Sequence, residues 1–283
     1  MKLAIIGDEL DQDLNRVVDA VLENEFEGIE VRSVWNTQPD KLSNEQLKKI
    51  HRVIKDTNLT VSGFDSACFK TLLPRTQKEL EEARKSFQQA IEQARILNAG
   101  FVRIFTFYKE GYPDPLAAGK IIKEIIKDIV PDDIGIYIET GMRTNTPTIQ
   151  HMLKCFDIIG DNRLGIVWDP GNSIFAGASI SPFPNDYFAG RELIKHIHIK
   201  DPIGQKEYVR LGDGDVPWFN IIQQLKEDNY QGWLSLETHW RIGRVLSQDE
   251  RDNPWFDRFS LGGYEASIEC MKKLKRYMKG LDQ

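Results

Sequence analysis

The chain has 283 residues, with 37 lysines and arginines against 43 aspartates and glutamates, and therefore a formal charge of −6. An acidic balance without a basic block argues against nonspecific nucleic-acid binding, which clustered Lys and Arg side chains drive. No apolar stretch approaches the roughly 18–20 residues that a membrane-spanning helix needs. The composition therefore predicts a globular chain with neither a nucleic-acid nor a membrane partner.

The N-terminus and the cysteines indicate the compartment. Met1–Asp8 carries a single lysine and an apolar run of only four residues, which is too short for a signal peptide. Cys68, Cys155 and Cys270 are widely spaced and form no Cys-x-x-Cys pair, so neither a disulfide framework nor a zinc knuckle is expected. We expect a cytoplasmic protein whose cysteines pack as small hydrophobic residues.

Short β-branched runs alternate with longer amphipathic segments along the whole chain. The expected strands are Leu3–Ile6, Gly28–Arg32, Thr60–Phe64, Phe101–Phe105, Ile134–Glu139, Leu164–Asp169, His196–Lys200 and Trp233–Glu237. The expected helices are Asp11–Asn24, Asn44–Asp56, Gln77–Asn98, Pro115–Val130, Thr146–Ile159, Tyr187–Lys195, Pro217–Asp228 and Gly263–Lys279. Irregular stretches follow the late strands, at Asn172–Asp186, Asp201–Val216 and His239–Leu261.

Strict βα alternation predicts one parallel sheet, either open and doubly wound or closed as a barrel. An open dinucleotide-binding sheet should show G-x-G-x-x-G after its first strand, but Gly7 is followed by Asp8-Glu9-Leu10-Asp11, which offers no phosphate cradle. Eight strands favour the barrel, and long loops after late strands are where barrel enzymes keep their sites. The sequence predicts an α/β fold, with residues 1–283 forming a single (β/α)8 TIM barrel domain.

Four late strands each carry a metal-competent side chain near the C-terminal end. Side chains alternate across a strand, and the apolar neighbours of these four residues share the opposite parity. All four should therefore point toward the barrel axis. They are Glu139, Asp169, His198 and Glu237.

Three carboxylates packed in one cavity repel one another unless they are protonated or neutralised by a cation. A single acidic residue at a strand end is more often a helix cap or a solvated carboxylate. Four such side chains in consecutive units, all pointing inward, instead favour one divalent metal ion. Oxygen ligands with one imidazole suit Mn²⁺, Mg²⁺ or Co²⁺ and tolerate Zn²⁺, so the metal stays open.

An ordered set of motifs surrounds these residues: Tyr137–Thr140, Trp168–Asn172, His196–Asp201, Leu234–Glu237 and Leu211–Trp218. Together they resemble the xylose isomerase-like TIM barrel superfamily, in particular its sugar phosphate isomerase/epimerase branch. The resemblance implies a single divalent metal held at Glu139, Asp169, His198 and Glu237, with both glutamates transferring protons. It makes the second histidine of the His-x-His motif the ligand, so His196 is expected to support it or to pack in the core.

Five further residues are candidates for contact with the substrate. Lys200 has inward parity and could reach a substrate oxygen or pair with Asp201. Arg103 and Glu30 also point inward, and for them an ion pair or hydrogen-bond network is favoured over substrate contact. Arg210 is a candidate only through the resemblance, whereas His239 shares the parity of Glu237.

The reaction expected first is isomerisation or epimerisation of a ketose or polyol-derived substrate, because two glutamates beside a metal can move a proton through an enediolate. A lyase resembling inosose dehydratase is the alternative, since the same intermediate can expel a β-hydroxyl. A non-catalytic sugar-binding barrel is less favoured. An AP endonuclease-like hydrolase is disfavoured because the extra histidines are missing and Asn172 replaces one of them. Homo-oligomers are common in this branch, so one is possible here.

Overall fold

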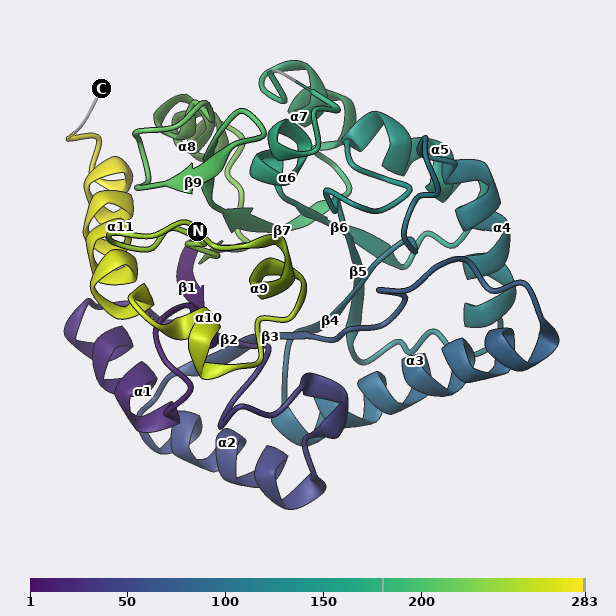
Figure 1. The fold of residues 1–283 in the computed structure, drawn as a ribbon, viewed down its shortest axis with the longest axis horizontal. Helices are drawn as coiled ribbons and strands as arrows, with labels where there is room; N and C mark the ends of the chain where they lie inside the picture. Colours follow the sequence, from purple (N-terminus) through teal and green to yellow (C-terminus); the bar gives the residue numbers. More distant parts are fainter. Residues whose placement is uncertain (180, 282–283) are drawn as a thin grey trace.

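Eight parallel strands close into a barrel in the order β1-β10-β7-β6-β5-β4-β3-β2, which confirms the predicted α/β TIM barrel (Figure 1). The structure is a computed structural model that describes residues 1–179 and 181–281. The barrel strands are β1 (Lys2–Ile6), β2 (Gly28–Val31), β3 (Thr60–Asp65), β4 (Phe101–Ile104), β5 (Gly135–Glu139), β6 (Leu164–Trp168), β7 (Ile194–Ile199) and β10 (Trp233–Leu236). Parallel pairing of β1 with both β2 and β10 closes the ring.

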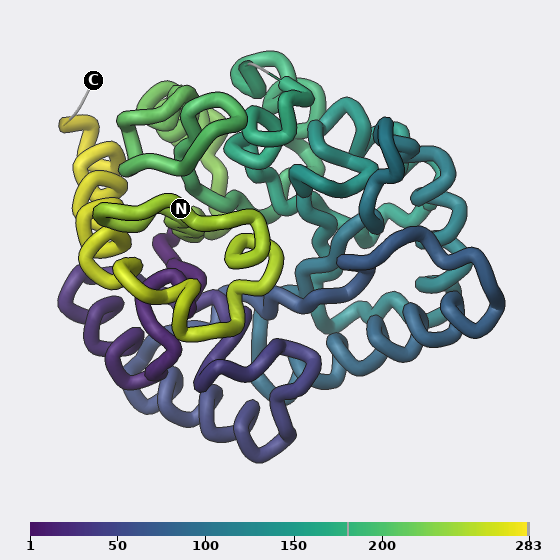
Figure 2. The backbone as a smooth tube through the Cα atoms, viewed as in Figure 1, coloured from purple at the N-terminus to yellow at the C-terminus, as the bar shows by residue number. Residues whose placement is uncertain are grey.

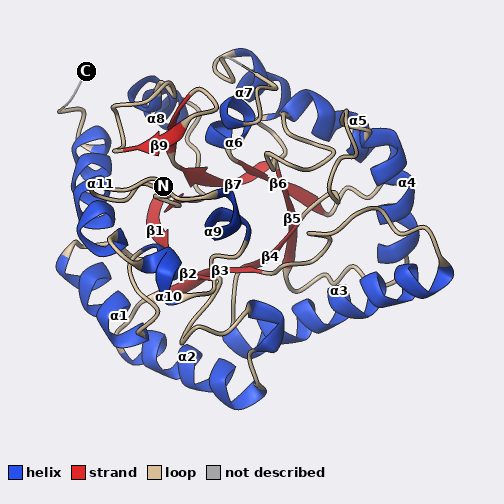
Figure 3. Cartoon of the chain, in the orientation of Figure 1, coloured by secondary structure: helices blue, strands red, loops and turns tan. Residues whose placement is uncertain are grey.

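Helices surround the ring of strands, as Figure 3 shows. They are α1 (Leu14–Glu23), α2 (Asn44–Asp56), α3 (Gln77–Leu97), α4 (Pro115–Ile126), α5 (Ile149–Ile159), α6 (Pro170–Phe175), α7 (Asn185–Gly190), α8 (Trp218–Glu227) and α11 (Gly263–Met278). The chain circles the barrel in sequence order, which brings the last helix beside the first (Figure 2). Within the described residues, no helix combines the length and the apolar character needed to cross a membrane.

Local sequence signals explain where two of the long helices begin. The Ser43 side chain accepts the backbone N–H of Gln46, whose side chain accepts the Ser43 N–H in return; Thr76 and Glu79 repeat this capping box at α3. Each box satisfies backbone donors that a helix N-terminus leaves without partners.

The expected helix Tyr187–Lys195 was wrong in its second half. Helix α7 ends at Gly190, and the chain enters β7 at Ile194, which pairs with Ile166 of β6. Ile194 is buried within the sheet, and this burial outweighs the helical periodicity read from the sequence.

Aromatic rings pack together inside the barrel, toward the N-terminal ends of the strands. The Phe101 ring stacks on Tyr137 with their centroids 4.8 Å apart and lies 4.5 Å from the His196 ring. A Cβ on Gly63 would lie 2.3 Å from the Phe101 ring, so only glycine leaves room for it. This packed layer closes the barrel from below and leaves polar chemistry to its C-terminal end.

The long stretches after β7 and β10 form additional elements at that end. A hairpin follows β7, and two short helices follow β10. They are β8 (Asp201–Ile203), β9 (Glu207–Val209), α9 (Gln248–Asp252) and α10 (Asp257–Ser260). Two 3-10 turns, η1 (Gly7–Glu9) and η2 (Pro39–Lys41), follow β1 and β2. Figure 1 shows α9 over the middle of the ring of strands.

The cysteines lie in the packed layers around this barrel. Cys68, Cys155 and Cys270 are all buried and free, as the sequence predicted. No disulfide therefore joins these three cysteines.

Candidate active site

The four side chains predicted to converge do so at the C-terminal end of the barrel. Glu139 ends β5, His198 lies in β7, and Asp169 and Glu237 each follow the last residue of a strand. One ligand atom from each lies within 4.8 Å of the others, and all four residues are buried. The alternation of side chains along the strands therefore placed them correctly.

His198 presents a free ring nitrogen to this cluster. Its Nε2 lies 3.0 Å from Glu30 Oε1, and its Nδ1 has no hydrogen-bond partner although it is buried. The Nδ1 atom lies 3.7 Å from both Glu139 Oε1 and Glu237 Oε2. A histidine whose outer nitrogen is held by a carboxylate and whose inner nitrogen faces further carboxylates has the arrangement of a metal ligand.

The two carboxylate oxygens of Asp169 have different roles: one caps a helix, and the other makes an ion pair but no hydrogen bond. Its Oδ1 accepts the backbone N–H of Asn172 at 2.8 Å and so caps α6. Its Oδ2 is buried, makes no hydrogen bond and lies 2.7 Å from Lys200 Nζ. The helix cap and the convergent carboxylate, weighed as alternatives in the sequence, are both present in one side chain. With His198 Nδ1 lacking a hydrogen bond and Asp169 Oδ2 held only by its ion pair with Lys200, the donor set fits a divalent cation.

Glu139 is held on both oxygens. Arg103 Nη1 donates to Oε2 at 2.5 Å, and the Asn172 side-chain amide donates to Oε1 at 2.8 Å. Arg103 also lies 3.6 Å from Asp65, a buried carboxylate of β3. Arg103 therefore belongs to an ion-pair network and lines the pocket as well.

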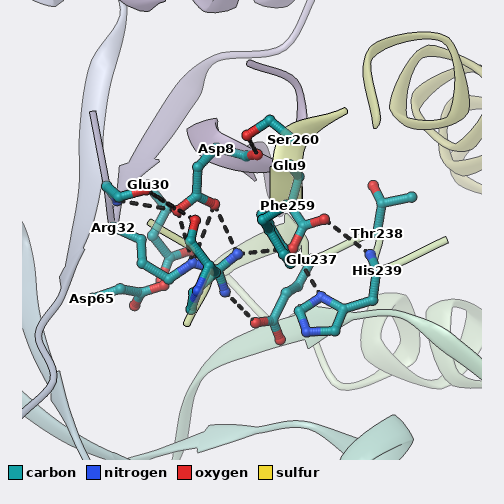
Figure 4. Close-up of polar contacts among 12 residues, drawn as sticks. Asp8, Glu9, Glu30, Arg32, Asp65, Glu237, Thr238, His239, Phe259 and Ser260 are labelled. Atoms are coloured by element: carbon teal, nitrogen blue, oxygen red, sulfur yellow. Dashed lines mark hydrogen bonds and ion pairs between the residues drawn. The ribbon is translucent and has the colours of Figure 1, made fainter. Parts of the chain in front are cut away.

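Glu237 is held by a larger buried network on the β1–β2 side, shown in Figure 4. Arg32 Nη1 donates to Glu237 Oε1 at 2.5 Å, and the rest of its guanidinium contacts Asp8 and Glu9. Glu9 also accepts the His239 backbone N–H at 2.9 Å and faces His239 Nδ1 at 2.8 Å. His239 adopts a left-handed backbone, with φ at +49°, which turns the chain back toward Glu9 directly after β10.

Lys200 does not pair with Asp201, which was one of the two expected roles. Its ammonium group contacts Asp169 and Glu237 instead, while Asp201 accepts the backbone N–H groups of Gly212, Gly214 and Val216. The stem of Lys200 runs over Gly171, where a Cβ would lie 2.8 Å from Lys200 Cγ. The glycine of the Trp168–Asn172 motif therefore lets this lysine reach the carboxylates.

Burial and charge pairing set the pKa values in the cluster. Burial raises the pKa of Glu139, but Arg103 and His198 outweigh it and lower that pKa to about 2. Burial likewise opposes ionisation of Glu237, yet Lys200, His239 and Arg32 hold its pKa well below the usual range. For Asp169 burial prevails over Lys200 and raises the pKa to about 7. Both glutamates are thus ionised at neutral pH, as proton acceptors must be.

Two residues of the cluster, Glu139 and Glu237, line a pocket at this end of the barrel. Among the expected contacts, Lys200, Arg103 and His239 line it. Glu30 does not, because it is fully buried under His196 and His198, at 2.9 and 3.0 Å from their Nε2 atoms. Arg210 does not line it either, because it is exposed and pairs with Asp213.

Sequence reasoning missed several pocket residues. Arg32 is the last residue of the expected strand Gly28–Arg32 and shares the inward parity of Glu30, a signal that could have identified it. Asn172 was noted only as the end of the Trp168–Asn172 motif and for the histidine that it replaces, and its hydrogen bond to Glu139 depends on the turn into α6. Other missed residues include Lys70, Tyr108, Arg143, Arg251 and Asp252, all on loops or on α9, where strand parity gives no information.

Comparison with known proteins places this arrangement in a family. The chain is 22% identical over 260 residues to an inosose dehydratase of Clostridium botulinum, covering 79% of this chain and 82% of the relative. Its structure resembles that of an L-ribulose 3-epimerase, with a TM-score of 0.76 and 14% identity over 99% of this chain and 95% of the other. It also resembles the IOLI protein with a bound zinc atom, with a TM-score of 0.74 and 16% identity over the full length of both chains. Residues 18–274 match the xylose isomerase-like TIM barrel family, and the chain belongs to that family.

Proposed function

We propose that this protein is a divalent-metal-dependent isomerase or epimerase that moves a proton beside the carbonyl of a sugar- or polyol-derived substrate. The observation that carries the proposal is the convergence of Glu139 and Glu237 on the free Nδ1 atom of His198. A binding module has no need of two ionised glutamates on a buried imidazole. The family contains enzymes, and relatives of this chain are named as a dehydratase and as epimerases.

Glu139, Asp169, His198 and Glu237 would hold the metal ion. When bound, such an ion supplies a Lewis acid that polarises a carbonyl and stabilises the negative charge that develops beside it. Zinc in the IOLI protein supports a metal in this fold, and the donor set leaves Mn²⁺, Mg²⁺, Co²⁺ and Zn²⁺ open.

The protein's own residues then handle the proton. One glutamate takes the proton from carbon and, in isomerisation, returns that same proton to the neighbouring carbon. In epimerisation the other glutamate, which is also ionised, first takes up a proton from water and then delivers it to the opposite face. Arg103 and Asn172 orient Glu139, whereas Arg32 and Lys200 orient Glu237. Lys200 Nζ, at the edge of the pocket floor, can also donate a hydrogen bond to a substrate oxygen.

A second candidate is dehydration, which the inosose dehydratase relatives favour. Removal of the same proton is followed by cleavage of the bond from the β-carbon to its hydroxyl oxygen. The protonated glutamate returns its proton to that leaving hydroxyl, which departs as water. Isomerisation conserves the mass of the substrate and dehydration lowers it by one water, so mass spectrometry of the product separates the two.

The test is hydrogen exchange from D₂O into a panel of ketoses and inososes, with the metal content of the protein measured in parallel. We expect exchange that chelation abolishes and that Glu139→Gln lowers by about 10²–10⁴-fold. The matched control Glu124→Gln, on the exposed side of α4, should keep full exchange. Full activity after verified metal removal, or in folded Glu139→Gln, would contradict the proposal. The cytoplasmic location and a possible homo-oligomer stay predictions.

A further inference from the structure

The pocket lining contains more cationic groups than the proposed reaction requires. Only three acidic side chains line it, namely Glu139, Glu237 and Asp252. Six cationic side chains line it: Arg32, Lys70, Arg103, Arg143, Lys200 and Arg251. Arg32, Arg103, Arg143 and Lys200 form ion pairs with carboxylates. Lys70 and Arg251 form none among the described residues, so a neutral sugar would leave their two charges without a counterpart in a partly desolvated space.

Three of the six cations already contact the proposed metal ligands. Arg103 contacts Glu139, Arg32 contacts Glu237, and Lys200 contacts both Asp169 and Glu237. A divalent ion on the same carboxylates would add positive charge that those carboxylates no longer offset. The loaded pocket therefore favours a ligand that brings negative charge of its own.

Lys70, in the loop after β3, has no carboxylate partner among the described residues. Its Nζ donates to the backbone carbonyl of Asp252 at 3.0 Å. Its other neighbours are the aromatic rings of Phe105 and Trp255, at 5.9 and 5.6 Å from Nζ. A half-buried ammonium with one neutral acceptor keeps two donors for a ligand.

Arg251, in α9, has the same character. Its guanidinium donates to the carbonyl of Leu246 and lies 5.0 Å from the Phe175 ring. Its Nε is buried without a partner, and the described residues include no carboxylate in an ion pair with it. Arg143 completes the group, because its ion pair with Asp252 joins it to the helix that carries Arg251.

We propose that the substrate carries an oxyanion group, a carboxylate or a phosphate, which Lys70 and Arg251 bind at the pocket mouth beneath α9. This inference rests on the proposed function, because it names the substrate class of the same pocket. The anionic group does not react. It orients the carbonyl end of the substrate toward Glu139 and Glu237, so that binding at the mouth contributes to alignment at the floor.

The electrostatics of Lys70 agree with this assignment. Burial, together with the nearby positive charges of Arg103 and Arg32, lowers the pKa of Lys70 to about 8, although Asp252 and Glu139 partly oppose this shift. An oxyanion at this position would relieve the repulsion among these cations.

The test compares three ligands that share a six-membered polyol ring. Myo-inositol is neutral, quinate carries a carboxylate, and inositol 1-phosphate carries a phosphate. Isothermal titration of the full chain, both metal-loaded and metal-free, measures the affinity for each. We expect at least one anionic ligand to bind about tenfold or more tightly than myo-inositol in both forms. The preferred anion identifies the oxyanion.

Variants locate the effect. Lys70→Gln and Arg251→Gln should each lower the affinity for the preferred anion by about tenfold and leave the affinity for myo-inositol unchanged. Lys78→Gln removes the same charge from an exposed position on α3 and should change neither affinity. A preference that survives both pocket variants would overturn the assignment, as would equal binding of all three ligands or no saturable binding of either anion.

The metal-free titration also separates this inference from the proposed function. An anion preference without metal-dependent hydrogen exchange would contradict the proposed reaction and leave the anion site standing. Efficient exchange into a neutral ketose, unaffected by Lys70→Gln, would have the opposite meaning. The chemistry would then hold and the anion site would be wrong.

Discussion

The two halves of the barrel contribute differently to the site. The four convergent side chains lie on β5 and β7 or directly follow β6 and β10. Three groups that hold them, Glu30, Arg32 and Arg103, come from β2, from the residue after β2 and from β4. In the half formed by β5, β6, β7 and β10, buried atoms such as His198 Nδ1 and Asp169 Oδ2 lack hydrogen bonds. In the half formed by β1 to β4, the Arg32 guanidinium contacts three carboxylates, those of Asp8, Glu9 and Glu237.

This contrast shows where a ligand can add to the structure. Unsatisfied polar atoms in a buried site are costly unless something binds them, so the β5–β10 half is built to receive an ion or a substrate. The Arg32 network on the β1–β2 side fixes positions and charge, although Asp65 and Arg103 Nε on β3 and β4 also lack hydrogen bonds. Substitutions in the two halves should therefore have different signatures, one in chemistry and one in stability.

The largest effect is expected from His198→Gln. The substitution removes the only nitrogen ligand of the candidate metal site, so bound metal and hydrogen exchange should both fall to background while the fold is kept. Metal analysis after dialysis, together with circular dichroism, checks this. A folded variant that keeps its metal would show that the β5–β10 half does not hold the ion as proposed.

Arg32→Met tests the buried ion-pair network around Arg32. It leaves Asp8, Glu9 and Glu237 buried without their shared cation, and breaking a buried ion pair from one side costs roughly 3–5 kcal/mol of unfolding free energy. Urea denaturation measures this cost. Arg75→Met, which removes an exposed pair with Glu110, should cost less than about 1 kcal/mol. Similar losses in both variants would mean that the buried network does not stabilise the fold.

Glu30→Gln tests the contact between the two halves. Glu30 holds the Nε2 atoms of both His196 and His198 from β2, and the amide of glutamine can keep the shape but not the charge. Loss of such an outer partner typically lowers metal affinity about 10–100-fold. Competition with a chelator measures the affinity. An unchanged affinity would indicate that His198 needs no support from β2.

The smallest effect concerns pH at the pocket mouth. The pKa of Lys70 is lowered to about 8, so its charge is present below that pH and is lost as pH rises through it. Arg32, Arg103, Glu139 and Asp252 also act on Lys70, but the two arginines and Glu139 do not titrate in this range. Anion affinity should therefore fall about tenfold or less from pH 7 to pH 9.

Lys70→Arg serves as the matched control for this pH dependence. Guanidinium stays protonated across the range, so the variant should bind the anion with little change between the two pH values. Titration calorimetry in matched buffers gives both profiles. If the variant and the parent protein lose affinity in parallel, another group is responsible.

Sequence alone could predict the β5–β10 half because the information there is local. Each of Glu139, Asp169, His198 and Glu237 stands at a strand end, and its neighbours set the parity that turns it inward. The support half could not be assembled in this way. Arg32 meets Glu237 across 205 residues of chain, and no spacing along the sequence reports such a pairing.

The loops show the same limit. Arg210 lies in the Leu211–Trp218 region that carried the family resemblance, yet the structure leaves it exposed beside Asp213. Arg251 drew no attention in the sequence, although α9 brings it over the barrel. Where a loop residue ends up depends on how the whole loop packs, and neither parity nor motif fixes that.

The cap that Asp169 forms on α6 has a consequence for binding. With Oδ1 fixed by a backbone amide, the carboxyl group cannot rotate freely, so the position of Oδ2 beside Lys200 is set by the fold. The conformational entropy of this ligand is lost during folding and not during binding. Asparagine caps helices as well as aspartate does, so Asp169→Asn should keep the helix and the orientation while removing the charge. Rigidity of the site and affinity for cations are thus two properties of the Asp169 side chain. Replacing one of its carboxylate oxygens by an amide nitrogen should remove the second property and keep the first.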